Sequence, residues 1–111
     1  MISVHEISRT EVLLKFPENV SPEQTEKVFK DILNAPFHKV TVDCSELLHL
    51  DHKVLGKLYM FNMDLQFSKR KMVLIGCSEK IRNLLHLTKI DERIEIAKET
   101  FQSPRFNKPT Q

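Results

Sequence analysis

Apolar segments of two kinds alternate along this chain, and the alternation constrains its fold more than any other feature. Residues 38–44 (HKVTVDC) and 71–76 (KMVLIG) are short runs rich in β-branched side chains, which is typical of strands. Residues 20–33 and 54–67 instead repeat apolar side chains at helical spacing. Strands that alternate with helices predict an α/β fold with a mostly parallel sheet and right-handed crossover helices.

The complete predicted order of elements is β-β-α-β-α-β-α-β. Residues 2–8 and 10–16 are expected to form a hairpin, a third helix begins after Ser78, and residues 92–97 form the last strand. The run at residues 71–76 is apolar without alternation. We therefore expect it to be a central strand that is covered on both faces.

The bulk composition excludes several classes of protein. The 111 residues predict one domain, which we place at residues 1–101, followed by a flexible tail at 102–111. A net charge of +2 is too balanced to indicate nucleic-acid binding, and we interpret the basic cluster at residues 69–71 as a solvated turn. No secretion signal or membrane span is visible, and two cysteines fit a reducing compartment. We therefore expect a cytoplasmic protein without membrane insertion.

The most chemically crowded stretch is LHLDHKVLG, residues 48–56. Its two histidines, His49 and His52, could join Cys44 as metal ligands. However, the spacing C-x4-H-x2-H is not one that zinc sites use, and no second pair of ligands completes it. We therefore expect no metal and no cofactor, and we interpret both histidines as surface or half-buried side chains.

Cys77 is a second candidate for chemistry. It follows the predicted central strand and precedes Ser78, where a helix N-terminus would lower the pKa of a thiol. Arg82 follows at C-x4-R, one residue short of the spacing in cysteine phosphatases, and no glycine lies between them to form a phosphate cradle. A small apolar cysteine at the end of a buried strand is the commoner case, so catalysis by Cys77 is the least favoured hypothesis.

Residues 40–91 resemble the core of a STAS domain, the family of anti-sigma factor antagonists. The resemblance extends over residues 2–101 and lies in an ordered set of short motifs: Asp43 and Ser45, then Asp51, Leu55 and Gly56, then MVLIG, then NLLHLTKID. It implies a single non-enzymatic STAS-like domain that binds a protein partner. In the family this partner is an anti-sigma factor that resembles a serine kinase.

The chain departs from the family pattern at the loop that is phosphorylated. Family members carry D-S-S-G there, whereas here His52 and Lys53 follow Asp51, and Val54 replaces the glycine. A serine kinase cannot phosphorylate an imidazole or an ammonium group, and Lys53 places a positive charge where the phosphate would be negative. We therefore expect the usual switch to be absent from this degenerate loop. Phosphorylation stays open at other hydroxyl residues: Ser45, Ser78 and Thr88.

The helix that follows this loop is the expected partner surface. Its face opposite the core carries charged residues and a methionine, and exposed methionines suit adaptable protein interfaces. We expect the partner to bind six residues: Asp51, His52, Lys53, Lys57, Met60 and Asp64. A cation such as Lys53 at a helix N-terminus costs about 0.3–1 kcal/mol, which Asp51 can offset as the N-cap. Gly56 is expected to let the helix pack closely on the sheet.

Three functions stay open at this point. The first is an anti-sigma factor antagonist-like regulator of a bacterial partner-switching pathway that is not phosphorylated at the usual loop. The second is an accessory subunit of a lipid-transport ATPase, because STAS-like proteins also occur there. The third is an enzyme that uses Cys77. The sequence also leaves open who the partner is and whether the chain forms a homodimer.

Overall fold

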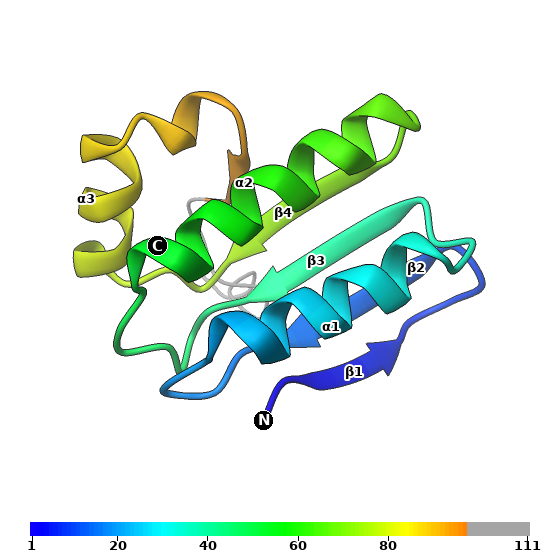
Figure 1. Cartoon of the computed structure of the whole chain (residues 1–111), viewed down its shortest axis with the longest axis horizontal. Helices are drawn as coiled ribbons and strands as arrows, with labels where there is room; N and C mark the ends of the chain where they lie inside the picture. Colours follow the sequence, from blue (N-terminus) through cyan, green and yellow to red (C-terminus); the bar gives the residue numbers. More distant parts are fainter. Residues whose placement is uncertain (98–111) are drawn as a thin grey trace, which may run out of the picture.

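Five strands form a single sheet in the order β1-β2-β3-β4-β5 in the computed structural model, which describes residues 1–97 (Figure 1). The strands are β1 (Ser3–Glu6), β2 (Glu11–Lys15), β3 (Lys39–Asp43), β4 (Lys71–Ile75) and β5 (Glu95–Ile96). β1 and β2 are antiparallel, and every other neighbouring pair is parallel. This arrangement confirms the predicted α/β fold, its order of elements and its mostly parallel sheet.

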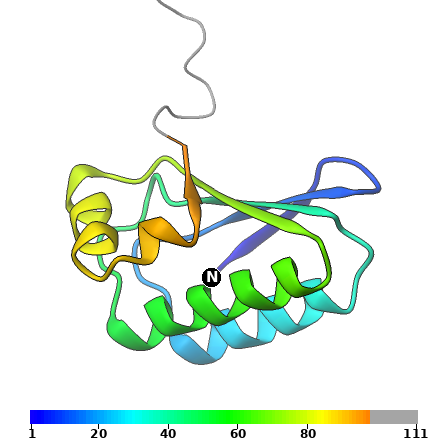
Figure 2. The ribbon, with the colours of Figure 1, turned by 90° about the horizontal axis from the view of Figure 1, so that it is seen from above.

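Helices connect the parallel strands, as the alternation of segments predicts. They are α1 (Pro22–Leu33), α2 (His52–Phe67), α3 (Glu79–Leu87) and the short 3-10 helix η1 (Ile90–Glu92). α1 and α2 lie side by side on the same face of the sheet (Figure 2). No helix within residues 1–97 is both long enough and apolar enough to cross a membrane.

Serine side chains cap the N-termini of α1 and α3, and Ser78 is the residue after which the third helix is predicted to begin. Ser21 Oγ accepts a hydrogen bond from the Gln24 amide (3.1 Å), and Ser78 Oγ accepts one from the Ile81 amide (3.2 Å). Each hydroxyl thus pairs one of the amides that a helix N-terminus leaves without an intrahelical partner. α2 begins at His52, two residues earlier than the predicted start at residue 54, because Asp51 supplies its cap.

The core lies between the sheet and the two helices that cover it. All four residues from Met72 to Ile75 in β4 are buried, as predicted for a central strand. Phe29 of α1 and Phe61 of α2 stack with ring centroids 3.9 Å apart and an interplanar angle of 6°. Full burial of such a side chain contributes about 1.5–3 kcal/mol, so this pair helps to hold α1 against α2.

The last strand is shorter than the predicted range of residues 92–97. Lys89 adopts a left-handed conformation (φ 62°), and the Glu92 and Arg93 amides bond to the Lys89 (3.2 Å) and Ile90 (2.9 Å) carbonyls, which forms η1 in place of the first strand residues. Ile94 is nevertheless buried, as the apolar pattern suggests. The predicted tail at 102–111 and the domain boundary at residue 101 lie outside the described residues.

The basic cluster at residues 69–71 is not simply a solvated turn. The Arg70 guanidinium donates hydrogen bonds to three backbone carbonyls at and after the end of α1, those of Leu33 (3.1 Å), Ala35 (3.0 Å) and Phe37 (3.2 Å). A helix C-terminus leaves carbonyls without intrahelical donors, and a guanidinium can serve several of them at once. Arg70 therefore ties the end of α1 to the turn between α2 and β4.

Candidate functional site

The N-terminus of α2 lies at the end of the sheet where the parallel strands β3 and β4 also end (Figure 1). Asp51 precedes it, and its Oδ1 accepts hydrogen bonds from the amides of Lys53 (2.7 Å) and Val54 (3.0 Å). The carboxylate pairs two helix amides and places a negative charge at the positive end of the helix dipole. Asp51 therefore has a structural role here that does not depend on phosphorylation of the loop.

His52 and Lys53 occupy the first two positions of α2, and both side chains are exposed. The first turn of α2 contains no acidic residue, so Lys53 carries its charge against the positive end of the helix dipole. Within residues 1–97, neither side chain has a hydrogen bond or an ion pair. Both are thus available for contact with another molecule.

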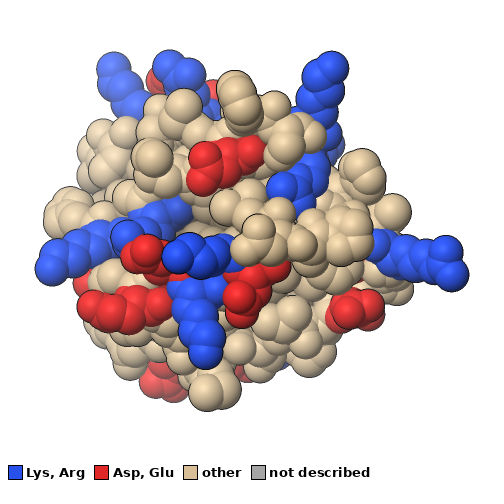
Figure 3. All heavy atoms as spheres, turned by 45° about the vertical axis from the view of Figure 1, so that its right-hand side comes forward, with Lys and Arg blue, Asp and Glu red and all other residues tan. Residues whose placement is uncertain are grey.

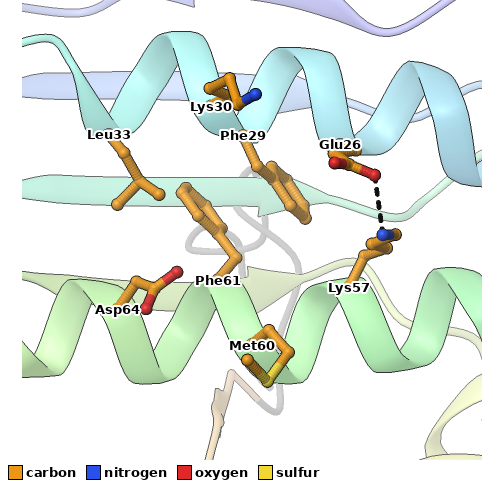
Figure 4. Close-up of a pocket in the computed structure, with 8 residues that line it drawn as sticks. All are labelled: Glu26, Phe29, Lys30, Leu33, Lys57, Met60, Phe61 and Asp64. Atoms are coloured by element: carbon orange, nitrogen blue, oxygen red, sulfur yellow. Dashed lines mark hydrogen bonds and ion pairs between the residues drawn. The ribbon is translucent and has the colours of Figure 1, made fainter.

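Lys57, Met60 and Asp64 line one hollow of about 290 Å³ between α2 and α1 (Figure 4). The α1 side of this hollow, which we call the α1–α2 groove, includes Glu26, and Lys57 Nζ donates to Glu26 Oε1 at 2.7 Å. The hydrogen bond and the charge of Lys57 lower the pKa of Glu26 below its ordinary value. The remaining lining residues are Phe29, Lys30, Leu33 and Phe61.

The six predicted partner-binding residues surround the N-terminal half of α2 but do not share one hollow. Lys53 lines a second hollow that adjoins the groove and also includes Lys57 and Met60. His52 lies on another side of the helix, in a hollow between α2 and the segment around η1. Asp51 borders a fourth hollow, against α3. The structure thus gathers Lys53, Lys57, Met60 and Asp64 on the side of α2 that faces α1.

Gly56 does not pack on the sheet, so the expectation of close packing there is wrong. No heavy atom lies within 4 Å of the place that a Cβ would occupy. The residue is exposed and borders both the Lys53 hollow and the His52 hollow. A glycine inside a helix costs about 1 kcal/mol relative to alanine, and no contact within the described part of the chain requires it here.

The six predicted partner-binding residues leave out two exposed apolar residues of α2, Met63 and Phe67. Met60, Met63 and Phe67 are 57%, 45% and 93% exposed, and their spacing of three and four residues places them along one stripe of the helix. Large apolar side chains at this exposure are a feature of protein interaction sites. The signal was present in the sequence, because these positions fall outside the stripe of buried residues that faces the core.

The charges near the site do not point to nucleic acid. On the face shown in Figure 3, lysine and arginine side chains alternate with acidic ones and form no continuous basic patch. Ion pairs between surface side chains of the described residues include Lys57 with Glu26 (2.7 Å) and Lys15 with Glu46 (3.3 Å). A surface of mixed sign suits a protein partner better than a polyanion.

The two cysteines and the histidines do not form a metal cluster. Within residues 1–97, no group of three or more histidine, cysteine, aspartate or glutamate side chains could hold an ion. Cys44 is buried and Cys77 is half-buried, whereas His49 and His52 are exposed. A hydrogen bond with Cys77 and burial raise the pKa of Cys44, while the hydrogen bond from Cys44 and the charge of Arg82 lower the pKa of Cys77.

Comparison with known proteins defines the class of this fold. A family model for the STAS domain matches residues 18–104. The solution structure of TM1081 from Thermotoga maritima has a TM-score of 0.78 at 23% identity, over 90% of this chain and 82% of that one. The anti-sigma factor antagonist SpoIIAA in its unphosphorylated form has a TM-score of 0.75 at 13% identity, over 89% and 90%. A STAS domain protein from Planctomyces limnophilus has a TM-score of 0.67 at 20% identity, over 86% and 87%.

The chain therefore belongs to the STAS domain family. At these identities the likeness to solved structures establishes the fold alone. No curated protein matches the chain.

Proposed function

We propose that this chain is a non-enzymatic, cytoplasmic STAS domain that acts as an anti-sigma factor antagonist-like regulator in a bacterial partner-switching pathway. Its partner is a protein of the anti-sigma factor and serine kinase-like class. The observation that carries the proposal is the start of α2. Asp51 caps the helix, while His52 and Lys53 are exposed, with no side-chain partner among residues 1–97, where the family pattern has hydroxyl residues.

The family membership supports the choice of partner class. SpoIIAA, whose fold this chain shares, is an anti-sigma factor antagonist whose structure has been solved both unphosphorylated and phosphorylated. A phosphate on the loop would place negative charge and strongly hydrated oxygens at the start of α2. Because His52 and Lys53 offer no hydroxyl to a serine kinase, the domain stays competent to bind its partner at this loop.

The composition of the α2 surface supports binding to a protein. Met60 and Met63 provide an adaptable apolar centre, and Lys53, Lys57 and Asp64 provide charges around it. Protein interfaces commonly combine an apolar centre with a polar rim of this kind. The exposed backbone at Gly56 leaves room for a partner side chain to approach the helix closely.

Affinity capture with paired variants tests this proposal. The purified chain, the double variant Lys53→Glu/Lys57→Glu and a matched control are each used as bait in extract of the source cells, with quantitative mass spectrometry. The control is Lys39→Glu/Lys71→Glu, which makes the same charge change at the opposite end of the parallel strands and also disrupts two surface ion pairs. Circular dichroism checks that all three baits are folded.

We expect a kinase-like anti-sigma factor on the wild-type and control baits, and at least about tenfold less of it on the Lys53→Glu/Lys57→Glu bait, because like charges at an interface are strongly unfavourable. The same partners in equal amounts on all three baits would contradict the proposed surface. Enrichment of a transport ATPase instead would favour the alternative of an accessory subunit.

A further inference from the structure

The two cysteines of the chain follow the ends of two neighbouring strands, β3 and β4, although they are far apart in sequence. β3 and β4 pair in parallel with Asp43 opposite Ile75. The Cys44 amide then donates to the Ile75 carbonyl at 2.8 Å, which extends the pairing of the two segments by one residue beyond β3. Cys44 therefore lies beside the start of the segment that contains Cys77.

Gly76 brings the two exiting segments into contact. Its φ is +68°, and a Cβ at this position would lie 3.0 Å from both Asp43 Oδ1 and Ser45 Cβ and 3.1 Å from the Ser45 nitrogen. Only glycine accommodates both this backbone conformation and this proximity. The backbone on either side of Gly76 thus runs directly against residues 43–45, and the Cys44 and Cys77 thiols lie close enough for each to shift the pKa of the other.

The two thiols differ in their exposure and in the direction in which their pKa is shifted. Cys44 is 2% exposed, so a dissolved oxidant cannot reach it, whereas Cys77 is half-buried. Cys77 directly precedes Ser78, the N-cap of α3, and the hydrogen bond from Cys44 together with the charge of Arg82 lowers its pKa despite burial and the nearby Asp43 carboxylate. A thiolate at a helix N-terminus is the more reactive nucleophile.

We propose that Cys44 and Cys77 form a reversible disulfide when the protein meets a small-molecule disulfide such as oxidised glutathione. Cys77 is the attacking residue and Cys44 is the resolving residue. This modification site is independent of the function proposed above, and it needs neither the partner protein nor any change in the α2 surface.

The exchange balances as two thiol–disulfide steps. The Cys77 thiolate attacks one sulfur of the small disulfide, which forms a mixed disulfide on Cys77 and releases one small thiolate. Cys44 then loses its proton and attacks the Cys77 sulfur, which forms the Cys44–Cys77 bond and releases the second small thiolate. Two electrons pass from the protein to the oxidant, and the protons end on the two released thiols.

The position of the bond gives it a defined structural effect. Cys44 begins the connection from β3 to the N-cap Asp51, and Cys77 lies in the connection from β4 to α3, directly before the N-cap Ser78. The Leu47 amide also bonds to the Cys44 carbonyl at 3.1 Å, so the first part of this connection turns directly around Cys44. The disulfide therefore links the loop that leads to the start of α2 with the loop that leads to α3.

The test treats the reduced full chain with excess oxidised glutathione and follows the product by intact mass and by peptide mapping without reduction. We expect the wild type to lose two hydrogens, to carry no glutathione, to show residues 44 and 77 in one linked peptide pair, and to return to the starting mass in dithiothreitol. A lasting glutathione adduct on Cys77, a bond only between two chains, or no reaction would each overturn the proposal.

Two single variants test the division of roles. Cys44→Ala should keep one glutathione on Cys77, because no second thiol can resolve the mixed disulfide. Cys77→Ala should stay unmodified while folded, because Cys44 is buried. Modification of Cys44 in folded Cys77→Ala would overturn the assignment of the attacking residue. The wild-type measurement decides the existence of the bond even if Cys44→Ala proves unstable by circular dichroism.

Discussion

Lys57 Nζ lies 2.7 Å from Glu26 Oε1, and this ion pair joins α2 to α1 at the edge of the α1–α2 groove (Figure 4). Both side chains are substantially exposed, so the pair contributes little to stability. The pair matters instead because it holds the Lys57 ammonium group beside Met60, which also lines the groove. Lys57 is therefore held at the proposed partner surface by a residue of a different helix.

Replacement of Lys57 by glutamine should raise the pKa of Glu26 toward its ordinary value, because the hydrogen bond and the positive charge both disappear. The folded-state pKa of Glu26 is depressed, so its ion pair contributes stability above the unfolded-state pKa. That contribution is lost as the pH falls through the folded-state value. The Lys57→Gln variant should accordingly lose less stability on the acid side than the wild type.

Carboxyl-carbon NMR titration of Glu26 measures this shift directly. Lys71→Gln is the control, since Lys71 pairs with Glu95 at 3.2 Å and should leave the Glu26 titration unchanged. An identical pKa of Glu26 in the wild type and in Lys57→Gln would show that the pair does not form in solution.

Truncation of Arg70 should destabilise the fold by about 2 kcal/mol, because three backbone carbonyls lose a charged donor. Arg70→Lys should recover only part of this loss, since an ammonium group cannot reproduce the planar fork of donors. Urea unfolding measures both variants. Lys27→Ala, an exposed position on α1, is the control and should change stability by less than about 0.5 kcal/mol. An Arg70→Ala variant as stable as this control would contradict the structural role.

Asn62 should be required to hold the end of the described chain against α2. It is buried, and its Nδ2 donates to the Arg93 carbonyl at 2.9 Å. Asn62→Ala leaves that carbonyl without its donor and should cost about 1–3 kcal/mol. Hydrogen exchange should become faster at the Ile94 and Ala97 amides, which bond to the Ile90 and Leu74 carbonyls, and exchange in β2 should accelerate less. Uniform acceleration across all strands would contradict a local anchoring role.

Gly56→Ala should stabilise the isolated domain by about 0.5–1 kcal/mol, because alanine is the better helix former and no atom lies near the added methyl group. If the partner approaches the helix at this point, the same methyl group should weaken binding. Thermal unfolding and a binding titration on the same variant separate the two effects. A variant that is more stable and binds equally well would show that the glycine does not serve the interface.

The elements of this fold follow from local sequence patterns. Ser21, Asp51 and Ser78 are recognisable as N-caps because the atoms they pair lie within three residues of them. The buried stripe of α2 and the unbroken apolar run of β4 are likewise local features. Local patterns therefore predicted the order of elements and most of their boundaries.

Features that depend on distant contacts could not be predicted in this way. Arg70 bonds to carbonyls that lie 33 to 37 residues earlier, so its sequence neighbours suggested only a basic turn. Cys44 and Cys77 meet only because β3 and β4 pair in one particular register. The expectation for Gly56 was wrong because its exposed side of the helix has no heavy atom within 4 Å of the place that a Cβ would occupy.

The candidate site could be predicted from the sequence only in part. Helical spacing alone placed Lys53, Lys57, Met60 and Asp64 on one side of α2, and they do line adjoining hollows that face α1. The same spacing could have identified Phe67 as exposed. It could not show that α1 contributes Glu26 and Lys30 to the groove, because no local pattern reports which helices become neighbours.

Binding at the start of α2, as we propose it, cannot be switched off by phosphorylation of the loop before it. The most direct measurement is the affinity of the domain for the captured kinase-like partner, by calorimetry, before and after incubation with that partner and ATP. The control is His52→Ser/Lys53→Ser, which restores the hydroxyl residues of the family pattern.

We predict that the wild type keeps its affinity and carries no phosphate on residues 45–54, whereas the control variant gains a phosphate and binds at least about tenfold more weakly. A phosphate within residues 45–54 of the wild type, together with a matching loss of affinity, would contradict the account.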